Sequence, residues 1–148
     1  MKIAVACDHA GFPYKGAVID CLREKGIDTI DLGCDSTDPV DYPDYAEAVG
    51  RAISRKEADR GILLCGSGIG VSIAANKIKG VRAAVCHDVY SARQGVEHND
   101  MNILALGARV ITIEQVRDLV AAFIDAKFSG VPRYQNRVMK ITALEEKK

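Results

Sequence analysis

The chain contains no tryptophan, and aromatic residues make up only 5% of its 148 residues, so platforms for stacking nucleic-acid bases are scarce. Its 20 Lys and Arg residues balance its 20 Asp and Glu residues, which gives a formal net charge of zero. A chain without a basic excess produces no general electrostatic field that would hold nucleic acid. We therefore expect no nucleic-acid partner.

Long hydrophobic runs are also lacking, because no stretch approaches the ~20 apolar residues that a membrane-spanning helix needs. Residues 3–7 are a short apolar run rather than the hydrophobic region of a signal peptide. The five cysteines are odd in number and include no C-x-x-C pair, which fits neither a disulfide framework nor a zinc ribbon. Reduced thiols in a cytoplasmic protein are the simpler interpretation, and we expect no membrane partner.

Short apolar runs alternate with amphipathic segments along the whole chain, which predicts one domain over residues 1–148. Strands are expected at residues 2–7, 27–32, 61–65, 81–86 and 102–106. Helices are expected at residues 13–25, 45–57, 69–78, 89–98, 113–128 and 135–145. This alternation indicates the α/β class, with a parallel sheet covered by helices on both faces.

The residues that follow the third expected strand carry the clearest functional signal. A buried strand ends at Cys65, and three glycines, Gly66, Gly68 and Gly70, lead into the next helix. Such a turn would expose the Cys65 thiol beside free backbone N–H groups, so one segment would supply a base or nucleophile and a cradle for negative charge. The pattern favours chemistry on an anionic small molecule, although a cysteine at this point can also be a small buried hydrophobe.

Two common interpretations of this glycine turn are weak. A dinucleotide-binding site would carry an acidic residue at the end of the next strand, where Cys86 and His87 stand. A phosphatase loop of the form C-x-x-x-x-x-R would need arginine at the position of Val71. The hydroxyls of Ser67 and Ser72 add hydrogen-bond donors near the start of the helix, which is consistent with an oxyanion ligand.

Further polar residues follow the ends of the first two strands and the fourth helix. Asp8 and His9 could transfer protons or bind a sugar hydroxyl and a phosphate, or Asp8 could cap the next helix while His9 lies on the surface. Asp41 and Tyr42 could line a pocket or merely cap the next helix. His98 stands at a helix end, where an imidazole often does no more than compensate the helix dipole.

Three arginines are candidates for phosphate binding, because the planar guanidinium group matches phosphate oxygens. They are Arg109, Arg133 and Arg137. The last two are four residues apart and share a helix face if the last helix begins early enough. The alternative is a solvated charged face.

In this order, these motifs resemble the ribose-5-phosphate isomerase B family, which includes the galactose-6-phosphate isomerase subunits. The resemblance runs from residue 2 to about residue 144. Its markers are residues 7–11, 40–43, 61–77, 80–84, 97–100 and 102–107 and the pair Arg133 and Arg137.

The resemblance implies a three-layer α/β/α sandwich whose Rossmann-like sheet has five parallel strands in the order 2-1-3-5-4. It implies a homodimer, which can pair into a tetramer, with each active site built from both subunits. The implied reaction interconverts D-ribose 5-phosphate and D-ribulose 5-phosphate through an enediolate, as in the pentose phosphate pathway. It uses no metal and no cofactor.

The resemblance also implies residue roles. Cys65 would be the general base between C2 and C1, His98 would open the furanose ring, and Asp8 would hold or shuttle a hydroxyl proton. The enediolate oxygen would be held by Ser67 and by the backbone N–H groups of Gly66, Gly68, Ile69 and Gly70. The phosphate would be held by His9, Arg109, Arg133 and Arg137, and the sugar hydroxyls by Asp41, Tyr42 and Asn99.

The chain departs from the family pattern in two places. Ser67 replaces the usual threonine and keeps the hydroxyl, whereas Tyr134 replaces a histidine after the altered loop Val131-Pro132, which leaves the preferred substrate length open. One alternative is an isomerase of a six-carbon sugar phosphate, such as allose 6-phosphate or galactose 6-phosphate. Another is a non-catalytic sugar-phosphate-binding module, which would need neither Cys65 nor His98.

Overall fold

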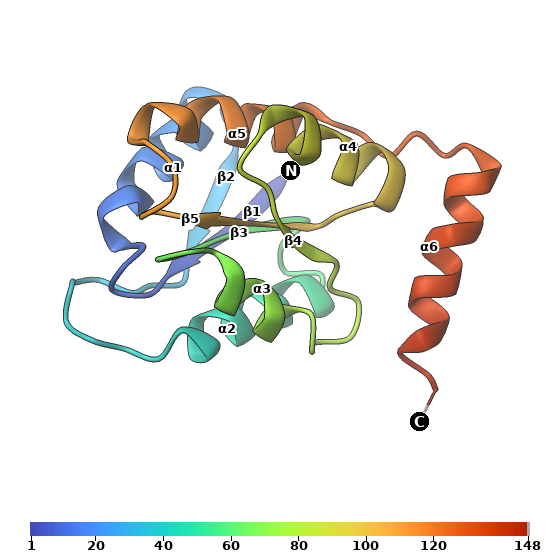
Figure 1. Ribbon diagram of the computed structural model, residues 1–148, viewed down its shortest axis with the longest axis horizontal. Helices are drawn as coiled ribbons and strands as arrows, with labels where there is room; N and C mark the ends of the chain where they lie inside the picture. The colour runs from blue at the N-terminus through green and yellow to red at the C-terminus, as the bar shows by residue number, and fades with distance from the viewer. Residues whose placement is uncertain (148) are drawn as a thin grey trace.

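The computed structural model describes residues 1–147 and contains one five-stranded parallel sheet with the strand order β2-β1-β3-β5-β4. Six helices accompany it (Figure 1). The strands are β1 (Lys2–Cys7), β2 (Asp28–Asp31), β3 (Arg60–Cys65), β4 (Ala83–Val85) and β5 (Ile103–Gly107). The helices are α1 (Phe12–Glu24), α2 (Tyr42–Ser54), α3 (Ile69–Ala75), α4 (Val89–Asn99), α5 (Ile113–Asp125) and α6 (Pro132–Leu144). The expected α/β class and strand order are confirmed.

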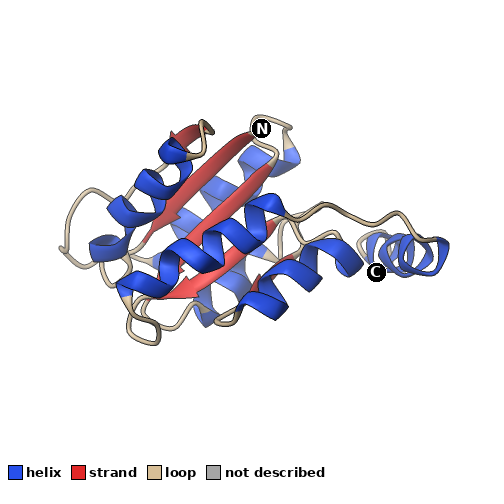
Figure 2. Ribbon diagram, turned by 90° about the horizontal axis from the view of Figure 1, so that it is seen from above, coloured by secondary structure: helices blue, strands red, loops and turns tan. Residues whose placement is uncertain are grey.

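The three central strands are apolar and buried beyond the first residues of β1 and β3, because helices cover both of their faces. Successive side chains alternate between two cores: Ile62 and Leu64 of β3 pack with α1, α4 and α5, whereas Leu63 and Cys65 pack with α2 and α3. Figure 2 shows the sheet between these two layers of helices. The alternation therefore directs Cys65 toward the α2 and α3 side of the sheet.

Helix α6 stands apart from both layers, at the right of Figure 1 and of Figure 2. None of its residues is buried, and Met139, Ile141 and Leu144 are exposed. Its packing partner within the chain is α4. An amphipathic helix normally buries its apolar side chains, so within residues 1–147 those of α6 form an apolar surface that no other segment buries.

Two helices begin three residues earlier than the sequence analysis expected. Helix α2 begins at Tyr42 rather than residue 45, and α6 begins at Pro132 rather than residue 135. In both, proline occupies the first turn, where its missing N–H group is not needed for helix hydrogen bonds. Because α6 begins early, Arg133 and Arg137 both lie on it, one turn apart.

The opposite difference is seen in α3, which ends at Ala75 rather than residue 78. The side-chain amide of Asn76 forms two hydrogen bonds of 2.8 Å with the backbone N–H and carbonyl of Ala83. These bonds tie the chain after α3 to the start of β4.

No helix of residues 1–147 is long and apolar enough to cross a membrane.

The end of α5 is held by Arg60 at the start of β3. Its guanidinium donates to the carbonyl of Phe123 at 2.5 Å and to that of Ala126 at 2.8 Å, and burial lowers its pKa from the usual value. Hydrogen bonds from charged groups contribute more than neutral ones. We expect Arg60→Met to lower the free energy of unfolding, measured in urea, by about 2 kcal/mol.

The matched control is Arg23→Met, because Arg23 is exposed and pairs with Asp20 on the surface of α1. An exposed pair of this kind contributes roughly 0.2–1 kcal/mol. Equal effects of the two substitutions would show that the Arg60 hydrogen bonds do not hold α5.

Candidate functional site

The carboxyl ends of β1, β3 and β5 meet at one edge of the sheet, where ligands of parallel α/β folds bind. Cys65 ends β3 and pairs in register with Gly107 of β5, and Asp8 directly follows β1. The backbone N–H of Asp8 donates to the carbonyl of Leu64 at 3.1 Å, which ties the start of its loop to β3. This edge therefore collects the residues that the sequence singled out after the first and third strands.

The sulfur of Cys65 accepts a hydrogen bond from the backbone N–H of Gly68 at 3.1 Å. Gly68 has a φ of 81°, and a Cβ atom there would lie 3.0 Å from the carbonyl carbon of Leu106. Both observations require glycine.

The thiol was expected to be exposed, and this is wrong: the turn folds back over Cys65, which is only 4% exposed in the single chain.

The remaining residues of the turn contact side chains from two other elements. A Cβ atom on Gly70 would lie 2.7 Å from the ring of Tyr42, so the ring at the start of α2 lies directly against the turn. On Gly66 a Cβ atom would approach a guanidinium nitrogen of Arg109 to 3.3 Å. The hydroxyl of Ser67 accepts the N–H of Ile69 at 3.2 Å. The predicted grouping of these residues around Cys65 is thus present in one chain.

Asp8 holds the turn that precedes α1, and it does not cap the helix itself, because the N-cap residue is Gly11. Its Oδ1 atom accepts the backbone N–H groups of Ala10 and Gly11, both at 2.9 Å, and the residue is buried. Gly11 permits this approach of α1 to the sheet, because a Cβ atom there would lie 2.5 Å from the carbonyl oxygen of Leu64. The second carboxylate oxygen, Oδ2, takes no part in these two bonds.

His9 is oriented by the loop that follows β2. Its Nδ1 atom accepts the backbone N–H of Val40 at 3.1 Å, which assigns the ring proton to Nε2. The next residue, Asp41, precedes α2 in an extended conformation, and its carboxylate forms no capping hydrogen bond with that helix. The contact with this loop thus leaves the Nε2–H group of His9 available as a donor. The Asp41 carboxylate is not used to cap α2.

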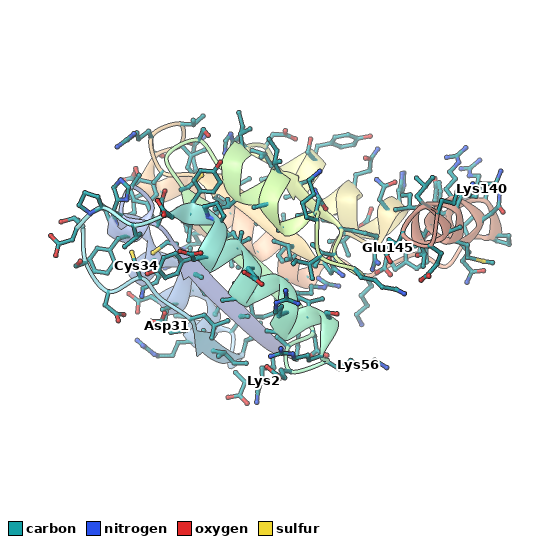
Figure 3. The ribbon with its side chains drawn as sticks, turned by 90° about the horizontal axis from the view of Figure 1, so that it is seen from below. Lys2, Asp31, Cys34, Lys56, Lys140 and Glu145 are labelled. Carbon is teal, nitrogen blue, oxygen red and sulfur yellow. The ribbon has the colours of Figure 1, made fainter. Side chains whose placement is uncertain are left out.

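A buried lysine fixes the beginning of the same loop. The Lys15 ammonium donates to Asp31 at 2.9 Å and to the carbonyl of Cys34 at 2.6 Å. Figure 3 shows Asp31 and Cys34 on the same side of the molecule. Hydrogen bonding to Asp31 and the Asp31 charge raise the pKa of Lys15 against the opposing effect of burial.

The other four cysteines are buried, as expected for packing residues. They are Cys7, Cys21, Cys34 and Cys86. Burial raises the pKa of Cys7 to about 12, helped by the adjacent Cys34, and burial raises that of Cys86 to about 11. Thiols with such pKa values stay protonated at neutral pH and are poor bases.

His98 and Asn99 lie at the opposite edge of the sheet. Helix α4 begins after the carboxyl end of β4 and runs back to Asn99, just before β5 begins at Ile103. The His98 ring stacks on Tyr134 of α6, with ring centroids 4.2 Å apart. Figure 3 shows Lys140 of α6 far from Cys34, which neighbours the end of β1.

The guanidinium groups of Arg133 and Arg137 lie 5.0 Å and 5.9 Å from the Tyr134 ring centroid. Tyr134 therefore contacts the His98 imidazole and lies close to both guanidinium groups. From the sequence, Tyr134 stands out only as a departure from a family pattern, because its partners depend on how α6 packs on α4. One chain thus brings together the Cys65 group but does not join it to the His98 group.

A cavity of about 920 Å³ lies at this second edge, between the α3–β4 connection, the end of α4 and α6. Asn99, Arg82, Ile141 and Leu144 are among its lining residues. Within residues 1–147, no three His, Cys, Asp or Glu side chains converge in a way that could hold a metal ion.

Comparison with known proteins identifies relatives along nearly the whole chain. Residues 3–141 match the model of the Ribose/Galactose Isomerase family. Ribose-5-phosphate isomerase B of Escherichia coli (strain K12) is 46% identical over 147 residues, covering 99% of this chain and 98% of that protein. D-erythrulose-4-phosphate isomerase of Pectobacterium atrosepticum is 43% identical, covering 88% and 86%.

Among solved structures, ribose-5-phosphate isomerase B of Clostridium thermocellum superposes with a TM-score of 0.96 at 46% identity. The superposition covers 99% of both chains. The similarity therefore includes α6 as well as the body of the sheet.

The geometry of Asp8 generates a prediction about stability. Asp8→Ala removes the acceptor of two backbone N–H groups in the turn before α1, and we expect it to lower the free energy of unfolding in urea by about 1–2 kcal/mol. Asp8→Asn keeps an oxygen acceptor and should stay within about 0.5 kcal/mol of the parent chain. Equal stability of the alanine variant and the parent would contradict the role of Asp8 in holding this turn.

Proposed function

Because the chain belongs to the ribose/galactose isomerase family, we propose that it is an aldose–ketose isomerase that interconverts D-ribose 5-phosphate and D-ribulose 5-phosphate. The observation that carries this proposal is the Cys65 sulfur held at 3.1 Å by the glycine turn. A proton acceptor and backbone N–H donors then stand together at the edge of the sheet where a small anionic ligand binds.

In the proposed reaction Cys65 acts as the general base. Its thiolate takes the proton from C2 of the open-chain aldose and returns it to C1, while the hydroxyl proton passes from O2 to O1. The negative charge of the enediolate oxygen would be held by Ser67 and by the backbone N–H groups of Gly66, Gly68, Ile69 and Gly70. A preorganised donor of this kind is typically worth roughly 10²–10³ in rate.

Asp8 would handle the hydroxyl proton through Oδ2, since Oδ1 already accepts two backbone N–H groups. His9 presents Nε2–H, and Arg109 lies beside Gly66. Both would contact the phosphate. Asp41 and Tyr42, at the start of α2, would contact sugar hydroxyls.

We further propose that the active protein is a homodimer with shared sites. His98 would open the furanose ring in the partner's site, Asn99 would contact a hydroxyl, and Arg133 and Arg137 would hold the phosphate. Their separation from Cys65 within one chain supports this arrangement. The unburied helix α6 supports it too, because a second copy would cover its apolar side chains.

The chain length of the preferred sugar phosphate is to be tested by comparing substrates of different length directly. The phosphate of a longer or shorter sugar would reach a different depth, and Tyr134 stands among the residues that would meet it. Allose 6-phosphate and galactose 6-phosphate therefore belong in the assay, together with D-erythrulose 4-phosphate. Five free thiols are consistent with a cytoplasmic location, which we propose as well.

The base role is tested with Cys65→Ala, assayed with ribose 5-phosphate in the presence of EDTA. We expect turnover to fall by at least about 10³-fold, because a positioned general base typically contributes 10²–10⁴-fold. Cys21→Ala, at a buried cysteine of α1, is the matched control and should keep full turnover. Full turnover by Cys65→Ala would exclude Cys65 as the base.

The same assay on the wild-type chain, with the whole panel of sugar phosphates, distinguishes the ribose 5-phosphate isomerase from its two alternatives. Turnover of a six-carbon phosphate alone would assign the enzyme to that substrate. Binding of ribose 5-phosphate without turnover of any sugar in the panel would indicate a sugar-phosphate-binding module.

The shared site is tested by mixing Cys65→Ala and His98→Ala chains after separate purification. In a two-fold dimer, one of the two sites of each mixed dimer is intact. Random reassortment should therefore restore about a quarter of the wild-type turnover. No recovery from mixed dimers, once native mass spectrometry shows that they have formed, would contradict sites built from two chains.

A further inference from the structure

His87 follows β4 and is not among the residues assigned above to the reaction. We propose that His87 is a positioning residue for the Cys65 turn, and that it acts through an acceptor that only the neutral imidazole possesses. This inference rests on the proposed isomerase function for its catalytic consequence. Its structural part does not depend on that function.

The contact is a hydrogen bond between two strand ends. The backbone N–H of Gly107 donates to Nε2 of His87 at 2.9 Å. Gly107 is the last residue of β5 and pairs with Cys65 of β3. His87 therefore holds the strand end that lies directly beside the proposed base.

Gly107 also packs against the turn itself. A Cβ atom on Gly107 would lie 2.6 Å from the backbone of Ser67, and one on Gly68 would lie 3.2 Å from the backbone nitrogen of Gly107. Backbone contacts leave no space for a side chain between the two segments. A shift of Gly107 would move Ser67 and Gly68, and Gly68 carries the N–H group that Cys65 accepts.

The hydrogen bond fixes the protonation of the ring. Nε2 must carry the lone pair, so the ring proton is on Nδ1. A second proton would place an N–H group against the N–H of Gly107 and abolish the bond. Neutral His87 therefore holds the strand end, and protonated His87 does not.

The surroundings of His87 favour the neutral ring. Burial lowers the pKa of His87 from its usual value, and the nearby charge of Asp88 opposes this effect. The Asp88 carboxylate accepts the N–H of Ser91 at the start of α4, and this hydrogen bond lowers its own pKa. From β5 the ring meets the backbone N–H of Gly107, and Gly107 in turn pairs with Cys65 of β3.

The sign of the pH effect follows from the lowered pKa of His87. Above the ordinary histidine pKa of about 6.5 the ring is neutral whether the chain is folded or unfolded. As the pH falls below that value, the unfolded chain binds a proton that the folded chain resists, so stability is lost toward the lowered pKa. The Gly107 hydrogen bond is present above this range and absent below it.

The experiment compares His87→Gln with His87→Leu in the full chain. The glutamine amide oxygen can accept the Gly107 N–H but does not titrate, whereas leucine provides no acceptor. At pH 8 we expect kcat to fall about 5–10-fold in His87→Leu, as for the loss of one hydrogen bond, with KM little changed. His87→Gln should stay within about 2-fold of wild type and should lose less activity than wild type as the pH falls from 7 to 5.

Two readouts do not require turnover. In the wild-type chain, which has three histidines, ¹⁵N NMR should show an Nδ1–H tautomer whose signal disappears in His87→Gln, and an Nε2–H tautomer for His9. The Tm of wild type should also fall more than that of His87→Gln between pH 7 and pH 5. These results stand even if ribose 5-phosphate is not the substrate, and kcat is then measured on whichever sugar phosphate reacts.

An Nε2–H tautomer at His87 would overturn the proposal. A His87→Leu variant with the kcat and the pH profile of the wild-type chain would overturn the proposal too. If His87→Leu does not fold, the comparison of His87→Gln with wild type decides alone: identical pH dependence of Tm and kcat would contradict the role of His87.

Discussion

The site depends on the close packing of backbone against backbone where β3 and β5 end. Cys65 and Gly107 are paired there, and the turn after Cys65 folds onto Gly107 with no space for a side chain at Gly68 or Gly107. The position of the N–H groups around the sulfur is therefore set by the register of a buried parallel sheet. A buried sheet moves little, which is what a preorganised charge-stabilising site requires.

The same topology keeps the His98 group away from the Cys65 turn within one chain. A helix that follows a parallel strand must run back along the sheet, so the end of α4 is carried to the edge opposite the Cys65 turn. His98, stacked on Tyr134, is thereby grouped with the arginines of α6. Two chains related by a two-fold axis could place each of these groups opposite the other, and the unburied α6 offers the surface for it.

Local signals explain what could be predicted from the sequence. Apolar runs indicated the strands, and the glycines after Cys65 indicated the turn, because both are properties of adjacent residues. The early start of α2 at Tyr42 was missed although Pro43 marks it. The burial of Cys65, the stack of His98 on Tyr134 and the contact of His87 with Gly107 arise from packing between distant segments, which no local pattern encodes.

Two histidines near the site show how the partner, rather than the residue type, determines chemistry. His9 accepts the backbone N–H of Val40 through Nδ1, which leaves its ring proton on Nε2. His87 accepts the backbone N–H of Gly107 through Nε2, which leaves its ring proton on Nδ1. A protonated His87 loses the acceptor that holds Gly107, the strand end paired with Cys65. The lowered pKa of His87 moves that loss to lower pH, so the fold keeps the acceptor in place where the unperturbed imidazole would already have lost it.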